Sequence, residues 1–201
     1  MIQTAVILTI FAALGGGLVA FSFQMTQKKI KANERAAFLS SLNALIPPEQ
    51  YDNNLLTDIH EGKNGILLGI NALMIYRARK DGQPVAAVLA PIIVNGYNGD
   101  IHLLVGIDYE GVLLGVRVIF HKETPGLGDG IDLRRSDWIL TFNGRSLINP
   151  NEAGWKVKRD GGAFDQLTGA TITPRAIVKA VHKTLLFFQQ YRDKIFAENS
   201  K

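Results

Sequence analysis

The N-terminal end of the chain most constrains what it can fold into, because residues 1–27 carry no charged side chain. Residues 5–23 read AVILTIFAALGGGLVAFSF, and a helix of that length spans roughly 28 Å, the thickness of a bilayer core. A buried helix of a soluble protein is one alternative. A cleaved signal peptide is another, since Ala20-Phe21-Ser22 loosely fits a cleavage site, but the usual charged leading segment is missing. We predict a retained transmembrane anchor over residues 1–25.

The charges that flank this span bear on its orientation. Lys28, Lys29 and Lys31 follow it directly, and only the amino terminus precedes it. The positive-inside bias therefore favours a cytoplasmic location for the rest of the chain. The same lysines are expected to lie among lipid headgroups.

The composition excludes several classes of function. The formal net charge is +4 with no basic stripe, so no nucleic-acid partner is expected. Cysteine is absent, which excludes thiolate-ligated iron–sulfur clusters, c-type haem attachment and a cysteine nucleophile. If this protein handles electrons, an organic cofactor must carry them.

A connecting amphipathic helix is predicted over residues 26–49. Apolar side chains recur there on one helical stripe, and Pro47-Pro48 ends it. The stripe consists of Ile30, Ala37, Phe38, Leu42 and Leu45.

The remainder, residues 50–201, is predicted to form one α+β domain, rich in antiparallel sheet with flanking helices. Apolar runs surround Asp81-Gly82 and the turn at 109–111, which indicates two hairpins. A weak pattern suggests a short helix within 132–142. A C-terminal helix is predicted from Pro174 with Thr173 as its N-cap. Its buried face would consist of Ile177, Val181, Leu185 and Phe188.

Two glycine-bearing stretches precede this helix. The stretch NGYNGDI, residues 95–101, has neither the glycine spacing nor the following helix of a dinucleotide-binding fingerprint. Taken alone, it predicts a turn. HKETPGLGDGID, residues 121–132, has three bare glycines that permit either close approach to a flat ligand or a simple turn. It fits a calcium loop poorly, and no metal site is expected.

A third stretch, DQLTGATITP, opens the C-terminal helix. A helix cap accounts for Thr173 and Pro174, but it does not account for the small residues and threonines at positions 168–171. Bare amides at a helix N-terminus bind anions, phosphate most commonly, although Asp165 would repel one. The alternative is that the whole stretch only caps the helix and binds no ligand.

These residues resemble a known signature. DQLTGAT, residues 165–171, resembles the D-x-x-[S/T]-G-A-T sequence at which a flavin transferase attaches flavin mononucleotide (FMN). With GYNGDI and HKETPGLGD in this order, the chain resembles the FMN-binding domain family. The N-terminal span and short length further resemble the G-subunit family of Rnf (Rsx) electron-transport complexes.

The resemblance implies roles for particular residues. Thr171 would form a phosphoester with FMN, and Thr173 would adjoin it in the cofactor site. The transferase signature would be completed by Asp165, Thr168, Gly169 and Ala170. The loop against the flavin ring would contain Glu123, Thr124, Gly126 and Leu127, with Lys158 near the flavin. No catalytic residue is expected, because the cofactor supplies the redox chemistry.

The function implied is that of a membrane-anchored electron carrier within an ion-translocating ferredoxin–NAD oxidoreductase of the Rnf type. Its partners would be the other Rnf subunits, membrane lipid and, during maturation, a flavin transferase. The resemblance places the globular domain on the periplasmic side of a bacterial inner membrane, against the lysine bias. The alternatives are the C subunit of a sodium-pumping quinone reductase, a regulatory membrane protein that binds FMN without relaying electrons, and an assembly module without a cofactor.

Overall fold

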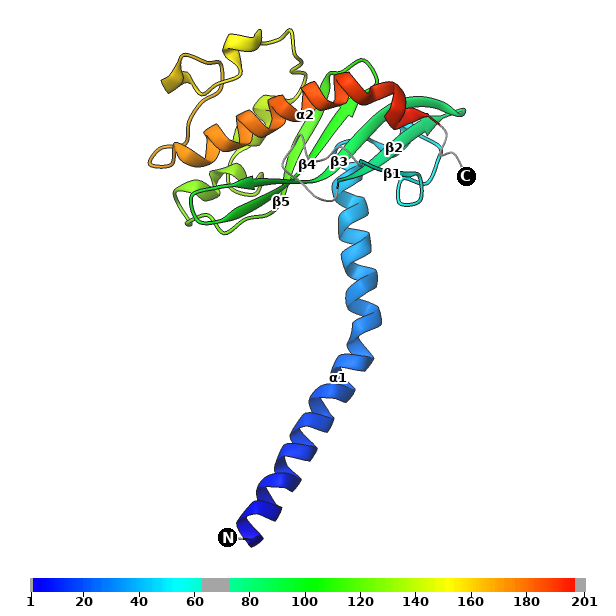
Figure 1. Cartoon of the computed structure of the whole chain (residues 1–201), viewed down its shortest axis with the longest axis vertical. Coiled ribbons are helices and arrows are strands. Elements are labelled where there is room, and N and C mark those ends of the chain that lie inside the picture. Colours follow the sequence, from blue (N-terminus) through cyan, green and yellow to red (C-terminus); the bar gives the residue numbers. More distant parts are fainter. Residues whose placement is uncertain (1, 63–72, 198–201) are drawn as a thin grey trace. The chain divides into compact units, whose positions relative to one another are not determined.

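The computed structural model describes residues 2–62 and 73–197, which form two compact units, Met1–Ser40 and Ser41–Lys201 (Figure 1). The first unit belongs to one continuous helix, α1, which spans Ile2–Asn43. The predicted anchor and most of the predicted connecting segment are therefore parts of a single helix. It ends ahead of Pro47, which is followed by a short 3-10 helix, η1, at Pro48–Gln50.

Within the described part of the chain, one helix is both long enough and apolar enough to cross a membrane, and this helix is α1. Its large apolar side chains are exposed on every side of the helix, as shown by Val6, Leu8 and Leu14, which are 52%, 65% and 62% exposed. Water would penalise this surface heavily, whereas lipid would not. The helix thus has the properties of a single-pass membrane anchor.

The second unit contains a five-stranded antiparallel sheet in the order β1-β2-β3-β4-β5. Every neighbouring pair is adjacent in sequence, so the sheet is a simple meander. The strands are β1 at Ile59–Glu61, β2 at Met74–Lys80, β3 at Gln83–Asn95, β4 at Asp100–Asp108 and β5 at Leu113–Phe120.

Both predicted hairpins are confirmed. Asp81 and Gly82, between β2 and β3, have φ of 51° and 75°, the left-handed conformation that a two-residue hairpin turn requires. Between β4 and β5, Gly111 has φ of 91°, and the Asp108 carboxylate accepts the Val112 amide at 2.8 Å. The α+β fold predicted from the sequence is confirmed by this sheet and its helices.

The long helix α2, Ile172–Phe196, packs along the sheet against β3 and β4 (Figure 1). Ile177, Val181, Leu185 and Phe188 are at most 1% exposed, which confirms the predicted buried face. Their burial against the sheet forms the main core of the unit.

The predicted start of this helix is wrong by two residues. α2 begins at Ile172 with Thr171 at the N-cap, so Thr173 and Pro174 lie inside the first turn. Proline is tolerated there because the first amides of a helix have no intrahelical acceptor. Thr173 does not cap the helix, because its hydroxyl donates to Glu123 instead.

The segment between β5 and α2 consists of short 3-10 helices around an aromatic cluster. They are η3 at Gly128–Ile131, η4 at Asp137–Phe142, η5 at Glu152–Gly154 and η6 at Lys158–Asp160. Ser136 caps η4 by accepting the Trp138 amide at 3.2 Å, and η4 is the short helix expected within 132–142. The cluster contains Trp138, Phe142, Trp155 and Phe164.

The C-terminal end of α2 is held by a buried arginine. Arg77 of β2 is 4% exposed, pairs with Asp58, and donates to the carbonyls of Ile195 and Ala197 at 3.0 and 2.9 Å. The last carbonyls of a helix lack intrahelical donors, so Arg77 satisfies the buried Ile195 carbonyl, which would otherwise be unpaired.

Candidate functional site

Three loops that are distant in sequence meet at the start of α2 through one carboxylate. The Glu123 side chain, in the loop after β5, accepts the amide of Asn98 at 3.0 Å and the Thr173 hydroxyl at 2.6 Å. Asn98 belongs to the β3–β4 loop and Thr173 to the first turn of α2. The predicted glycine-bearing stretches and the helix start therefore form one continuous region.

Glu123 is only 5% exposed, and among the described residues no lysine, arginine or histidine forms an ion pair with it. Its charge is offset instead by the two hydrogen bonds and by the positive N-terminal end of α2. A Cβ at Gly96 would lie 2.4 Å from one carboxylate oxygen, and one at Gly128 would lie 2.3 Å from the other. These two glycines are thus needed to admit the glutamate.

Thr171 occupies the N-cap of α2 with φ −90° and ψ −28°, and its hydroxyl makes no capping hydrogen bond. The residue is half-buried. The amides of Ile172 and Thr173 follow it in the first turn, where no intrahelical acceptor exists. The hydroxyl is therefore available for other chemistry, next to amides that favour an anion.

The residues just before Thr171 form a tight turn. The Ala170 amide donates to the Leu167 carbonyl at 3.1 Å, and Gly169 has φ of 77°. A Cβ on Gly169 would lie 2.9 Å from Leu127, so the loop after β5 packs directly on this turn. Leu127 is still 47% exposed, and Thr168 is exposed as well, which leaves apolar and polar surface beside the helix start.

Lys158 and Asp165 form an ion pair of 2.6 Å, with side chains 57% and 61% exposed. An exposed pair of this kind contributes little to stability. Its effect here is electrostatic, because the lysine offsets the carboxylate that would otherwise repel an anion near the helix.

The other predicted loop residues lie on the rim of this region. The Asn98 side-chain amide donates to the Thr124 hydroxyl at 3.3 Å, and the Gly126 amide donates to Asp129 at 2.8 Å. Further along, a hydrogen bond from Arg134 lowers the pKa of Asp132 to about 2. Hydrogen bonds to the carboxylates of Asp129 and Asp132 thus hold the loop after β5 in place.

Comparison with known proteins adds to this geometry. The FMN-binding domain family matches residues 96–186, and the RnfG N-terminal region matches residues 1–45. The G subunit of the ion-translocating oxidoreductase complex of Pseudoalteromonas atlantica is 46% identical over 99% of this chain and 93% of its own length. The proteins of the same name from Pseudomonas aeruginosa and Vibrio cholerae are 48% and 45% identical over 98% and 96% of this chain, and each is covered over 92% of its length. The chain belongs to the G-subunit family of ion-translocating oxidoreductase complexes.

The family relationship covers both units of the chain. Every predicted site residue, from Glu123 to Thr173, lies within the FMN-binding domain, and α1 corresponds to the family's N-terminal region. The resemblance to the G-subunit family is therefore confirmed, in preference to the C subunit of a quinone reductase.

Two residues of the site were not predicted from the sequence. Asn98 supplies an amide to Glu123 and a side-chain donor to Thr124. Trp138 donates its indole N–H to the main-chain carbonyl of Asp165 at 2.7 Å. Asn98 lies in a stretch that the resemblance had already marked, whereas nothing in the sequence near Trp138 indicates its contact 27 residues away.

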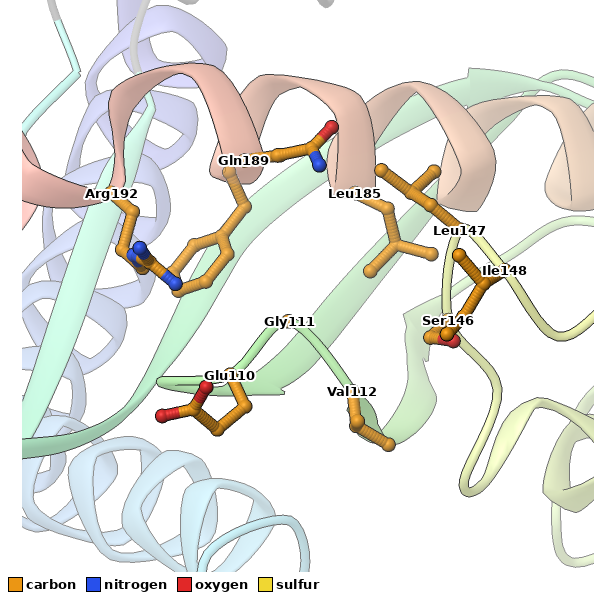
Figure 2. Close-up of a pocket in the computed structure, with 10 residues that line it drawn as sticks. Glu110, Gly111, Val112, Ser146, Leu147, Ile148, Leu185, Gln189 and Arg192 are labelled. Carbon is orange, nitrogen blue, oxygen red and sulfur yellow. The ribbon is translucent and has the colours of Figure 1, made fainter.

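A separate cavity of about 280 Å³ lies between the second half of α2 and the β4–β5 turn (Figure 2). Leu185 and Arg192 of α2 line it together with Gly111 and Ser146. None of the predicted site residues lines this cavity, so it is distinct from the candidate flavin site.

Proposed function

We propose that the chain is a membrane-anchored electron carrier of an Rnf-type complex, with FMN attached to Thr171 through a phosphoester. The observation that carries the proposal is the position of Thr171. Its hydroxyl is not used as a helix cap, although it stands at the start of a 25-residue helix inside an FMN-binding domain.

Attachment requires an activated donor, because an ester made from FMN itself would have to expel water. With flavin adenine dinucleotide (FAD) as donor, the Thr171 oxygen attacks the phosphorus on the flavin side. The P–O–P bond breaks, AMP leaves, and the hydroxyl proton passes to the transferase. Thr168, Gly169 and Ala170 shape the exposed turn that the transferase would engage.

Several residues would hold the group. The amides of Ile172 and Thr173 favour the phosphate charge, since they lie at the positive end of α2. Lys158 offsets Asp165, and the exposed part of Leu127 offers an apolar surface to the flavin ring. When bound, FMN supplies one- and two-electron redox chemistry, while the chain contributes position and electrostatics.

The partners are inferred from the name of the relatives, which are subunits of a complex. Copurification with other membrane subunits would separate an electron relay from a regulatory FMN-binding protein that works alone.

We further propose that the domain lies on the periplasmic side, where the transferase acts, despite Lys28, Lys29 and Lys31. A domain of this length can be translocated largely regardless of charge. Alkaline phosphatase fused after Lys201 is then expected to be active. A fluorescent protein that matures only in the cytoplasm and glows at that position would contradict this orientation.

The experiment for the attachment itself compares Thr171→Ala with the wild type in cells that contain the transferase. Flavin fluorescence of the denatured protein in a gel is expected to disappear in Thr171→Ala. A fluorescent band in Thr171→Ala would refute the assignment. Thr171→Ser retains a hydroxyl and tests whether the residue acts as the acceptor, because partial labelling is expected.

A further inference from the structure

Trp138 ties the proposed attachment signature to the core of the domain. It is 7% exposed, lies in η4, and packs edge-on against Phe142 with ring centroids 5.5 Å apart. Its indole N–H donates to the Asp165 main-chain carbonyl at 2.7 Å. Asp165 is the first residue of the signature, residues 165–171. The buried Trp138 side chain therefore fixes the position of the main chain at the start of the signature.

The other hydrogen bonds and ion pairs of the signature within the described residues are exposed or local. Asp165 pairs with exposed Lys158, the Gln166 side chain accepts the Arg159 amide at 3.3 Å, and one main-chain bond closes the turn to Ala170. Exposed contacts of this kind compete with water and contribute little. Among the polar contacts of the signature, the bond from Trp138 is therefore the one expected to hold Asp165 most firmly, while Leu167 packs against the core two residues further along.

We propose that Trp138 is a positioning residue for covalent flavin attachment. By holding the Asp165 carbonyl, it keeps residues 165–171 in the shape that a flavin transferase binds. The inference rests on the proposed function of Thr171. If the bond is lost, the competent shape is populated less, and the apparent affinity of the transferase for this protein falls by the same fraction.

The chain offers a closely matched control. Trp155 is 4% exposed and packs against Phe164 in the same aromatic cluster, but its indole nitrogen has no hydrogen-bond partner within the described residues. Trp138→Phe and Trp155→Phe therefore remove the same atoms from the same aromatic cluster, in which Trp155 also stacks on His182. Only Trp138→Phe removes a hydrogen bond.

The test uses full-length protein in detergent, purified flavin transferase and FAD, with initial rates of flavin incorporation measured against the concentration of the acceptor protein. Trp138→Phe is expected to raise KM by roughly two- to tenfold, the factor that one hydrogen bond of ordinary strength contributes. We expect kcat to stay unchanged. Trp155→Phe should match the wild type, and urea midpoints of both variants verify that they are folded.

Equal KM values for the two folded variants would overturn the role of Trp138. If the wild type and Trp155→Phe both accept no flavin, the proposed function itself fails, and this inference fails with it. If Trp138→Phe does not fold, β-(3-benzothienyl)alanine at position 138 replaces the N–H by sulfur with little change in shape. The same rise in KM is then expected, and an unchanged KM would refute the proposal.

Discussion

The bond between Thr173 and Glu123 leads to a quantitative prediction about stability. Thr173 is fully buried, and its hydroxyl donates to the Glu123 carboxylate at 2.6 Å. Thr173→Val keeps the shape and removes the hydroxyl, which leaves a buried carboxylate with one partner fewer. Hydrogen bonds to charged groups contribute about 1.5–3 kcal/mol. The free energy of unfolding should fall by about that amount, or by roughly 3–12 °C in Tm for a unit of this size.

The assay is urea unfolding of the full-length protein in detergent, followed by tryptophan fluorescence. Both tryptophans lie in the unit Ser41–Lys201 and are buried, so their emission reports on its unfolding. Thr168→Val is the control, because Thr168 is exposed and its hydroxyl has no hydrogen-bond partner in the described part of the chain. It should change stability by less than about 0.5 kcal/mol.

A double-mutant cycle with Glu123→Gln separates this contact from other effects of the substitution. Directly bonded residues show coupling of about 0.5–3 kcal/mol. If Thr173→Val and Glu123→Gln prove additive, or if Thr173→Val costs no more than Thr168→Val, the reasoning is refuted.

Two further predictions concern other buried charges. Arg77→Met should lower the free energy of unfolding by about 3–5 kcal/mol in the same urea titration, because it leaves Asp58 and the end of α2 short of donors. Arg79→Met should lower it by less, because Arg79 is more exposed and the ion pair between Arg77 and Asp58 remains. The pKa of Asp132 is lowered from 3.8 to about 2, chiefly by the hydrogen bond from Arg134. The ionised carboxylate therefore stabilises the fold above about pH 4, and this contribution is lost as pH falls towards 2. Asp132→Asn should flatten the pH dependence of the urea midpoint between those values, and an unchanged slope would contradict it.

The parts of the fold that could be predicted from sequence are those specified by neighbouring residues. Asp81-Gly82 can adopt the left-handed turn that its hairpin needs, and the spacing from Ile177 to Phe188 defines the buried face of α2. The apolar run in α1 likewise identifies an anchor by length and composition alone.

The parts that were missed depend on contacts between distant residues. Thr173-Pro174 has the local pattern of a cap and first helical residue, but an acceptor 50 positions away, Glu123, takes the hydroxyl and the helix starts earlier. Gly128 was expected either to allow close approach to a flat ligand or to serve a simple turn, and the sequence did not reveal that its bare Cα makes room for that same glutamate. Local propensity cannot reveal such tertiary partners.

Esterification of FMN to Thr171 is tested most directly by peptide mass spectrometry of the protein purified from membranes that contain the transferase. The tryptic peptide DGGAFDQLTGATITPR, residues 160–175, should carry the mass of one FMN less one water. Fragmentation should place that mass on Thr171. An unmodified peptide from a preparation in which the flavin remains bound after denaturation, or the same mass located on Thr168 or Thr173, would contradict the account.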